Sequence, residues 1–356
     1  MTAGWREGDP AGRRRWVRLR HPLELESGDL LPDVQIGYET WGLPNSTKSN
    51  GVLVLHALTG DSHVAGPGAP GWWEGLIGPG KAVDTNHFFV VAPNVLGGCQ
   101  GTTGPSSLAA DGKAWGSRFP ALTVRDQVAA EVLFADALGI GTWAGVLGGS
   151  MGGMRAVEWA VTHPSRVAAL LLLACPAAAS AEQIAWAAPQ LAAIRADPAW
   201  HGGDYHDNPP GPVTGLGIAR RIAHVTYRSE PELATRFGRS PQGDGRFAVE
   251  SYLDHQAAKL VARFDAGSYV VLTEAMNSHD VGRGRGGIEA ALSRVRAKTI
   301  VAGVDSDRLY PLSQQAELAA GIPGAGELNV VTSPYGHDAF LIETTQISAL
   351  AKELLT

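Results

Sequence analysis

The chain alternates between short apolar runs and longer stretches that are apolar along one side only. The short runs have the length of buried strands and lie at residues 34–40, 51–55, 87–92, 143–147 and 167–175. Residues 123–138 carry apolar side chains at helical spacing, which predicts a helix that ends at Gly139. Residues 154–162 predict a second helix, which ends at a His-Pro pair. Apolar strands separated by helices predict a mostly parallel sheet with helices on both faces, an α/β fold.

The pattern changes between about residues 176 and 294. This region is rich in Ala, Gln and Leu and reads as helical, with one short strand-like run at residues 269–272. Beyond it the alternation returns, with strands predicted at 298–303 and 328–331 and helices at 313–320 and 344–355.

The helical region is far longer than a connecting loop needs to be. We therefore expect an α/β core made of residues 1–177 and 295–356, with residues 178–294 inserted as a helical lid. An insertion that follows a strand near the nucleophile described below is well placed to cover a reactive site.

Composition narrows the class of protein. The 356 residues are 44% apolar and 18% charged, which is enough to bury a large core. The formal net charge of -6 supplies no basic field for nucleic acid, and no apolar run reaches membrane-spanning length. The two cysteines, Cys99 and Cys175, do not make a disulfide framework. We expect a cytoplasmic protein with no membrane or nucleic-acid partner.

Residues 148–152 read Gly-Gly-Ser-Met-Gly, the pattern G-x-S-x-G. The motif follows the predicted strand 143–147 and precedes the predicted helix, which is the setting of a nucleophile elbow. Such a turn strains the backbone at the serine and needs glycine around it. The sequence therefore predicts Ser150 as a catalytic nucleophile.

A serine hydroxyl needs an imidazole to take its proton and a carboxylate to orient that imidazole. With a nucleophile elbow these partners follow the serine in the order acid, then histidine. His337 follows the strand 328–331 and is the last histidine of the chain, so we expect it to be the base. Asp305 and Asp307 both follow the strand 298–303, and their spacing alone does not choose between them. We favour Asp307, which stands four residues before Pro311.

An oxyanion hole is expected to combine the backbone N–H after the nucleophile with one from a loop after an early strand. Met151 supplies the first. The loop at residues 56–60 supplies the second, with Leu58 preferred and Thr59 as the alternative.

Two other patterns carry weaker signals. Residues 282–287 fit G-x-G-x-x-G, but they lie in the helical region and do not open a helix after a strand, so a dinucleotide site is not expected. Two alternatives remain for this loop, contact with phosphates at a tunnel mouth or a plain connection. His201 and His206 lack companion ligands at metal-binding spacing, so no metal site is expected.

Taken together, these motifs resemble the homoserine O-acetyltransferase family of the α/β-hydrolase superfamily. The similar segments extend from about residue 15 to residue 350 and include residues 56–63, 94–105, 148–153, 277–287, 306–311 and 335–338. The resemblance implies an α/β-hydrolase fold with a helical lid and a triad of Ser150, Asp307 and His337.

The same resemblance implies a site for the amino-acid substrate. Arg220 would bind the homoserine carboxylate and Asp338 the amine, with Tyr227 of the lid beside them. Arg221 stands next to Arg220 and leaves that assignment open. Guanidinium for carboxylate and carboxylate for ammonium are the expected chemical partners.

The resemblance finally implies a ping-pong transfer from acetyl-CoA to L-homoserine through an acyl-Ser150 intermediate, as in methionine biosynthesis. Acetyl-CoA would be a co-substrate, no cofactor would be permanently bound, and the lid would form a homodimer contact. The alternatives are homoserine O-succinyltransferase, serine O-acyltransferase, and an esterase or thioesterase that uses the same triad.

Overall fold

The structure is a computed structural model that describes residues 4–66 and 69–356. Its centre is an eight-stranded sheet with the order β1-β4-β8-β5-β9-β10-β11-β12. Strand β4 is antiparallel to both of its neighbours, and the other neighbouring strands are parallel. The strands are β1 (Arg15–Arg18), β4 (Gln35–Trp41), β5 (Gly51–Leu55), β8 (Phe89–Pro93), β9 (Gly145–Gly149), β10 (Ala169–Leu173), β11 (Lys298–Val304) and β12 (Asn329–Val331). The mostly parallel α/β sheet expected from the sequence is confirmed.

Four shorter strands form two small sheets beside the main one. They are β2 (Leu23–Glu24) with β3 (Leu30–Leu31), and β6 (Ile77–Gly78) with β7 (Val83–Asp84).

Side chains of the parallel strands alternate between two apolar layers. Leu53 and Leu55 of β5 face one layer, whereas Val52 and Val54 of the same strand face the other. The first layer is covered by α1 (Val124–Leu138), α2 (Met151–Thr162), α8 (Ile288–Leu292) and α9 (Leu312–Gly321). The second layer is covered by α10 (Ala339–Ile342) and α11 (Thr344–Leu355). Burial on both faces explains why these strands are apolar throughout.

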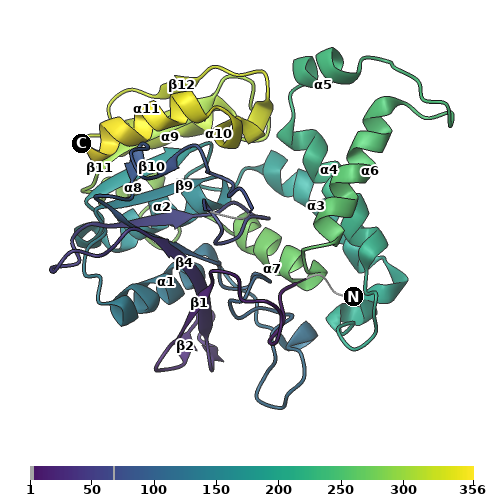
Figure 1. Ribbon diagram of the computed structural model, residues 1–356, viewed down its shortest axis with the longest axis horizontal. Helices are drawn as coiled ribbons and strands as arrows, with labels where there is room; N and C mark the ends of the chain where they lie inside the picture. The colour runs from purple at the N-terminus through teal and green to yellow at the C-terminus, as the bar shows by residue number, and fades with distance from the viewer. Residues whose placement is uncertain (1–3, 67–68) are drawn as a thin grey trace.

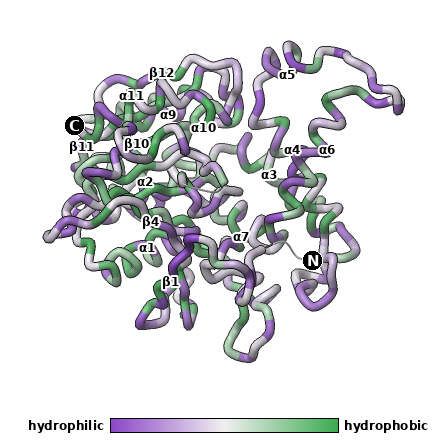
Figure 2. The backbone as a smooth tube through the Cα atoms, viewed as in Figure 1, coloured by the Kyte–Doolittle hydropathy of each residue, from purple (hydrophilic) through white to green (hydrophobic). Residues whose placement is uncertain are grey.

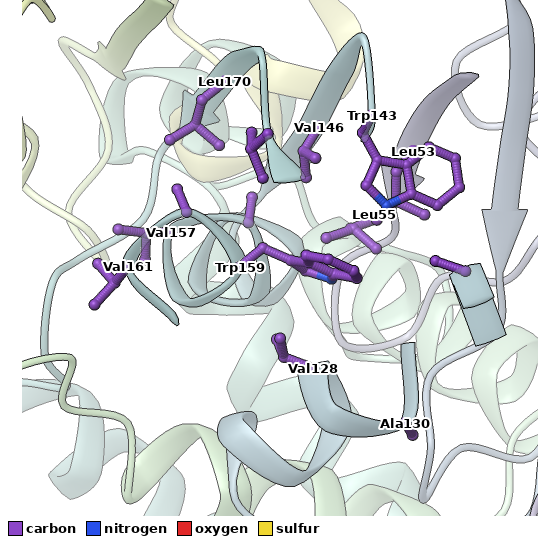
Figure 3. Packing of buried hydrophobic residues seen from close by; sticks show 14 of the residues in the cluster. Leu53, Leu55, Val128, Ala130, Trp143, Val146, Val157, Trp159, Val161 and Leu170 are labelled. Atoms are coloured by element: carbon purple, nitrogen blue, oxygen red, sulfur yellow. The ribbon is translucent and has the colours of Figure 1, made fainter. Parts of the chain in front are cut away.

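Figure 3 shows the packing of the first layer, with Val157 and Trp159 of α2 lying against Leu55 and Val146 of the sheet. Because these side chains are fully buried, α2 is fixed against the strand that precedes it. This packing sets the direction in which the chain leaves β9.

The inserted region contains α8, described above, and five further α-helices: α3 (Ala181–Arg195), α4 (Val213–Tyr227), α5 (Glu230–Phe237), α6 (Ala248–Val261) and α7 (Ala266–Asn277). Figure 1 shows α3 to α6 to one side of the sheet, with α7 between them and the core. A third apolar cluster joins the two parts, since Leu58 and Met151 of the core pack with Leu216 and Leu272 of these helices.

The prediction of a strand at residues 269–272 is wrong, because these residues belong to helix α7. Asp265 caps that helix by accepting a hydrogen bond from the backbone N–H of Ser268. Tyr269 and Leu272 are fully buried. A short apolar run of a buried helix has no polar face, so its pattern is the same as that of a buried strand.

Hydropathy along the chain follows this architecture. Figure 2 shows hydrophobic positions concentrated in the sheet and the helices packed on it, and hydrophilic positions gathered in outer loops such as the one between α5 and α6. Within residues 4–66 and 69–356, no helix is both long and apolar enough to cross a membrane.

Candidate active site

Ser150 lies at the sharp turn between β9 and α2. Its backbone has φ 55° and ψ -126°, a conformation that costs energy for a residue with a Cβ. A Cβ on Gly148 would lie 2.2 Å from the carbonyl oxygen of Gly152, and a Cβ on Gly152 would lie 2.0 Å from that of Leu55. Both positions therefore require glycine, and the turn holds the Ser150 hydroxyl at the edge of the sheet.

The structure brings Ser150, His337 and Asp307 together. The Nε2 atom of His337 lies 2.9 Å from Ser150 Oγ, and its Nδ1 atom lies 2.7 Å from Asp307 Oδ2. All three residues are buried. The arrangement allows His337 to take the hydroxyl proton while the carboxylate fixes the imidazole tautomer.

The two candidate carboxylates occupy different places. Asp307 Oδ1 accepts the backbone N–H groups of Leu309 and Tyr310, both at 2.9 Å, which leaves Oδ2 facing the imidazole. Asp305 instead accepts the backbone N–H of Ser333 at 3.0 Å. The structure thus places Asp307, and not Asp305, against the histidine.

Aromatic rings hold the imidazole from several sides. The ring centroid of His337 lies 4.8 Å from Tyr310, 5.4 Å from Phe340 and 5.8 Å from Tyr227. Burial raises the pKa of Tyr310, so its hydroxyl stays protonated. Tyr227 ends α4, so a helix of the inserted region contributes directly to the environment of the base.

Leu58 and Met151 lie in the segments expected to form the oxyanion hole, the loop after β5 and the first turn of α2. Among the described residues, neither backbone N–H donates to another backbone group. The first amides of a helix have no partner within it and carry partial positive charge. Both N–H groups therefore have no backbone partner in the two segments where the oxyanion hole is expected.

A buried network fixes the start of this loop. Arg155 donates from Nη2 to the carbonyl oxygen of His56 at 2.7 Å and from Nη1 to Glu131 at 2.5 Å. Glu131 also accepts from Trp159 Nε1 at 2.7 Å. Burial lowers the pKa of His56 to about 3, so its neutral ring accepts the backbone N–H of Val95. The network anchors residue 56 two positions before the expected donor.

A cavity of about 370 Å³ opens beside Ser150 and His337. Its wall includes Asp338 and Arg228, whose carboxylate and guanidinium lie 3.3 Å apart. Burial raises the pKa of Asp338, and the charge of Arg228 opposes that shift. The cavity therefore places a carboxylate within reach of the nucleophile.

Arg220 lines the same cavity from α4. Its guanidinium lies over the ring of Tyr227, 5.5 Å from the centroid. Among the residues that the structure describes, none accepts a hydrogen bond from the buried Nε and Nη1 groups of Arg220. Arg221 instead pairs with Asp254 at 2.7 Å. The cavity thus offers an unpaired guanidinium as well as a carboxylate.

Comparison with known proteins identifies the family of this chain. The α/β hydrolase fold family matches residues 50–344. A homoserine O-acetyltransferase of Thermobifida fusca is 68% identical, covering 99% of this chain and 97% of that protein. The chain belongs to the homoserine O-acetyltransferase family. Its family and its fold, both expected from the sequence, are confirmed.

Solved structures of the homoserine O-acetyltransferase family share the fold, and so does an esterase. The homoserine O-acetyltransferase of Bacillus anthracis has a TM-score of 0.88 at 28% identity, covering 96% of this chain and 97% of that one. Esterase E22 has a TM-score of 0.89 at 25% identity, covering 96% of this chain and 99% of that one. The backbone alone therefore does not separate transfer from hydrolysis.

Several cavity residues of this family member were missed in the sequence. His224 and Arg228 on or beside α4, and Lys259 and Arg263 on or after α6, all line the cavity. Their spacing is the signal that could have found them. His224 stands four residues after Arg220, so these two share one face of α4, and Arg263 stands four residues after Lys259, just past the end of α6.

The glycine-arginine loop at residues 282–287 makes structural contacts. Arg283 pairs with Glu26 at 2.9 Å, and Arg285 donates to Glu158 at 2.9 Å. These contacts favour the plain connection over the contact with phosphates. In the part of the chain that the structure describes, no three His, Cys, Asp or Glu side chains are grouped to hold a metal ion.

Proposed function

We propose that this protein transfers the acetyl group of acetyl-CoA to the hydroxyl of L-homoserine, giving O-acetyl-L-homoserine and CoA. The observation that carries the proposal is the hydrogen-bonded set Ser150, His337 and Asp307 beside a cavity with an unpaired guanidinium. The 68% identical relative named homoserine O-acetyltransferase supports the choice of substrates.

The first step acylates the enzyme. His337 Nε2 takes the proton of Ser150, and Oγ attacks the thioester carbonyl. The resulting oxyanion is stabilised by the N–H groups of Leu58 and Met151, with Thr59 as the alternative to Leu58. The carbon–sulfur bond breaks, His337 returns the proton to the departing thiolate, and acetyl-Ser150 and CoA-SH remain.

The second step discharges the acyl group. His337 takes the proton of the homoserine hydroxyl, whose oxygen attacks the ester carbonyl of acetyl-Ser150. The same N–H groups stabilise the oxyanion. The bond to Ser150 Oγ then breaks, and Oγ regains its proton from His337, so that the free enzyme is restored.

The charged ends of homoserine determine how it binds. Arg220 holds the carboxylate and Asp338 the ammonium group, with Tyr227 placed between the arginine and His337. Because Asp338 already faces Arg228 at 3.3 Å, the incoming ammonium joins an existing ion pair. Held at both ends, the substrate hydroxyl competes well with water for the acyl carbon.

Residues 178–294 act as the lid in this proposal. The end of α4 lies against the loop of His337, where Ser229 donates a hydrogen bond to the carbonyl of Pro334. A covered site limits the access of water to acetyl-Ser150, which would otherwise hydrolyse.

The lid also provides the proposed homodimer contact. Ile184 and Trp186 of α3 and Ile218 of α4 are large apolar residues that stay exposed in the isolated chain. Analytical ultracentrifugation of the parent and of a W186K/I218K variant tests this. If the parent and the variant are both dimers, the dimer contact lies elsewhere on the surface.

We place the reaction in the cytoplasm and in methionine biosynthesis. Both cysteines are free and buried, which suits a reducing compartment. Burial raises the pKa of Cys99 to about 12, so this thiol is not a competing nucleophile.

Hydrolysis is the second candidate function, because the similar esterase E22 shares the fold. Steady-state assays with acetyl-CoA and succinyl-CoA, each with homoserine and with serine, separate all the alternatives. The proposal predicts O-acetylhomoserine as the main product. Free acetate in its place would establish an esterase or thioesterase, and faster reaction with succinyl-CoA or serine would change the donor or the acceptor.

A further inference from the structure

The active-site cavity is cationic although the chain is acidic. Its wall carries four cationic side chains and a single carboxylate, Asp338, in a protein with a formal net charge of -6. The cations are Arg220, Arg228, Lys259 and Arg263. A concave surface of one charge concentrates ligands of the opposite charge.

The four cations form two groups on different segments. Arg220 on α4 and Arg228 just after it lie beside Asp338 and Tyr227, where the amino acid is proposed to bind. Lys259 on α6 and Arg263 just after it form the second group, with Gln256 one turn earlier on the same wall. We call Gln256, Lys259 and Arg263 the α6 wall.

The α6 wall has no carboxylate of its own. Among the described residues, the Lys259 ammonium takes part in no hydrogen bond or ion pair, and the Arg263 guanidinium donates only to the backbone carbonyl of Thr59 at 2.7 Å. Desolvation lowers the pKa of Arg263, Asp61 acts in the opposite direction, and the positive charge of Arg220 lowers it further. An anion bound at this wall would relieve the repulsion between the two guanidinium groups.

We propose that Lys259 and Arg263 bind the phosphate groups of the acyl-CoA donor. This inference rests on the proposed function. Homoserine brings one carboxylate, which Arg220 accounts for, whereas CoA brings a pyrophosphate and a 3′-phosphate. Those phosphates lie at the end of the pantetheine arm opposite to the thioester. A donor whose carbonyl is at Ser150 extends its arm into the cavity that the α6 wall lines.

The chemistry of the α6 wall suits phosphate. Lysine acts as a point charge that follows a mobile phosphate, and arginine donates in a fork that fits two phosphate oxygens. The other cationic candidate, the loop at residues 282–287, is not available, since Arg283 and Arg285 are paired with Glu26 and Glu158. Of these two segments, the α6 wall is the one whose cationic groups have no carboxylate partner among the described residues.

The test compares two donors that differ in their phosphates. Acylation of Ser150 is followed with acetyl-CoA and with S-acetyl-N-acetylcysteamine, a thioester that lacks the nucleotide and its phosphates. K259Q is expected to lower kcat/KM for acetyl-CoA by roughly three- to tenfold, the range for an exposed cation on a charged ligand. The same variant is expected to leave kcat/KM for S-acetyl-N-acetylcysteamine unchanged.

Three controls accompany this comparison. K259R keeps the charge and is expected to retain the acetyl-CoA rate. R239Q removes a positive charge from an exposed lid residue that does not line the cavity. It is expected to leave kcat/KM unchanged for both donors. Higher ionic strength is expected to lower the rate of the parent with acetyl-CoA towards that of K259Q.

R263Q is the second variant, because Arg263 also holds the carbonyl of Thr59 in the oxyanion loop. The proposal predicts a larger loss with acetyl-CoA than with the phosphate-free donor. Equal losses with both donors in K259Q and R263Q, or no loss with acetyl-CoA, would overturn it. If neither thioester acylates Ser150 in the parent, the proposed function itself fails, which is a separate result.

Discussion

The Nε2 atom of His337 lies 2.9 Å from the Oγ atom of Ser150, although 187 positions separate the two residues in the chain. Ser150 follows β9, and His337 lies in a short 3-10 helix (Gly336–Asp338) after β12. Parallel strands end at one edge of their sheet, so residues that follow different strands meet there. The distance permits direct proton transfer, which is the step on which the account depends.

Replacing Asp307 with Asn tests the role of the carboxylate. The amide cannot stabilise the imidazolium and favours the wrong tautomer of His337, so kcat is expected to fall by about 10⁴-fold. Stopped-flow measurement of the acylation step with acetyl-CoA provides the readout.

Asp305→Asn is the matched control, because among the described residues the Asp305 side chain accepts only the backbone N–H of Ser333. Its kcat is expected to stay within a few-fold of the parent. A larger loss of kcat in D305N than in D307N would show that Asp305, and not Asp307, is the acid of the triad.

Asp338→Asn tests the binding of the homoserine amine. The variant is expected to raise KM for homoserine while leaving the rate of Ser150 acylation by acetyl-CoA close to that of the parent. An equal loss in both half-reactions would instead show that Asp338 supports His337.

Asp338 also determines how kcat/KM for homoserine is expected to depend on pH. Burial raises the pKa of Asp338, so as pH falls its carboxylate is protonated earlier than an ordinary aspartate and loses its hold on the ammonium. On acidification, kcat/KM for homoserine is therefore expected to fall more steeply than kcat/KM for acetyl-CoA. In D338N the two profiles are expected to run parallel, and persistence of the difference would contradict the assignment.

Arg155→Met tests the buried network under the oxyanion loop. Loss of the guanidinium leaves Glu131 buried without its charge partner, at an expected cost of about 3–5 kcal/mol in the free energy of unfolding. The double variant R155M/E131Q removes the remaining charge and keeps an acceptor for Trp159, so urea unfolding is expected to show most of the stability restored. Failure of the second change to help would show that the pair is not coupled.

Gly152→Ala tests the close approach at the elbow. The new Cβ would lie 2.0 Å from the carbonyl oxygen of Leu55, so at least about 1–3 kcal/mol of stability is expected to be lost. Gly243→Ala is the matched control, because a Cβ there meets nothing within 4 Å. Thermal unfolding is expected to show a clear drop in Tm for G152A and a shift near zero for G243A.

The fold could be predicted from the sequence because parallel strands with helices on both faces must be apolar throughout. The run at residues 51–55 is β5, and the helix expected at 344–355 is α11. The strand predicted at residues 269–272 was wrong, since four consecutive apolar residues of a largely buried helix present the same pattern as a short strand.

The candidate site was predictable where the backbone imposes a rule. The order of Ser150 and His337 along the chain follows from the elbow. Spacing alone left Asp305 as an alternative to the favoured Asp307, and the hydrogen bonds of the structure place Asp307 against His337. Arg228 and Lys259 were missed because charged residues on or next to a helix are usually solvated, and only the packing of α4 and α6 shows which side chains meet the cavity.

The most direct test of the account is the intact mass of the protein after incubation with acetyl-CoA alone. The account predicts a gain of about 42 Da on Ser150, absent in S150A and lost again when homoserine is added, with release of O-acetylhomoserine. Steady turnover by the parent without this gain, or the same homoserine-reversible gain in S150A, would contradict it.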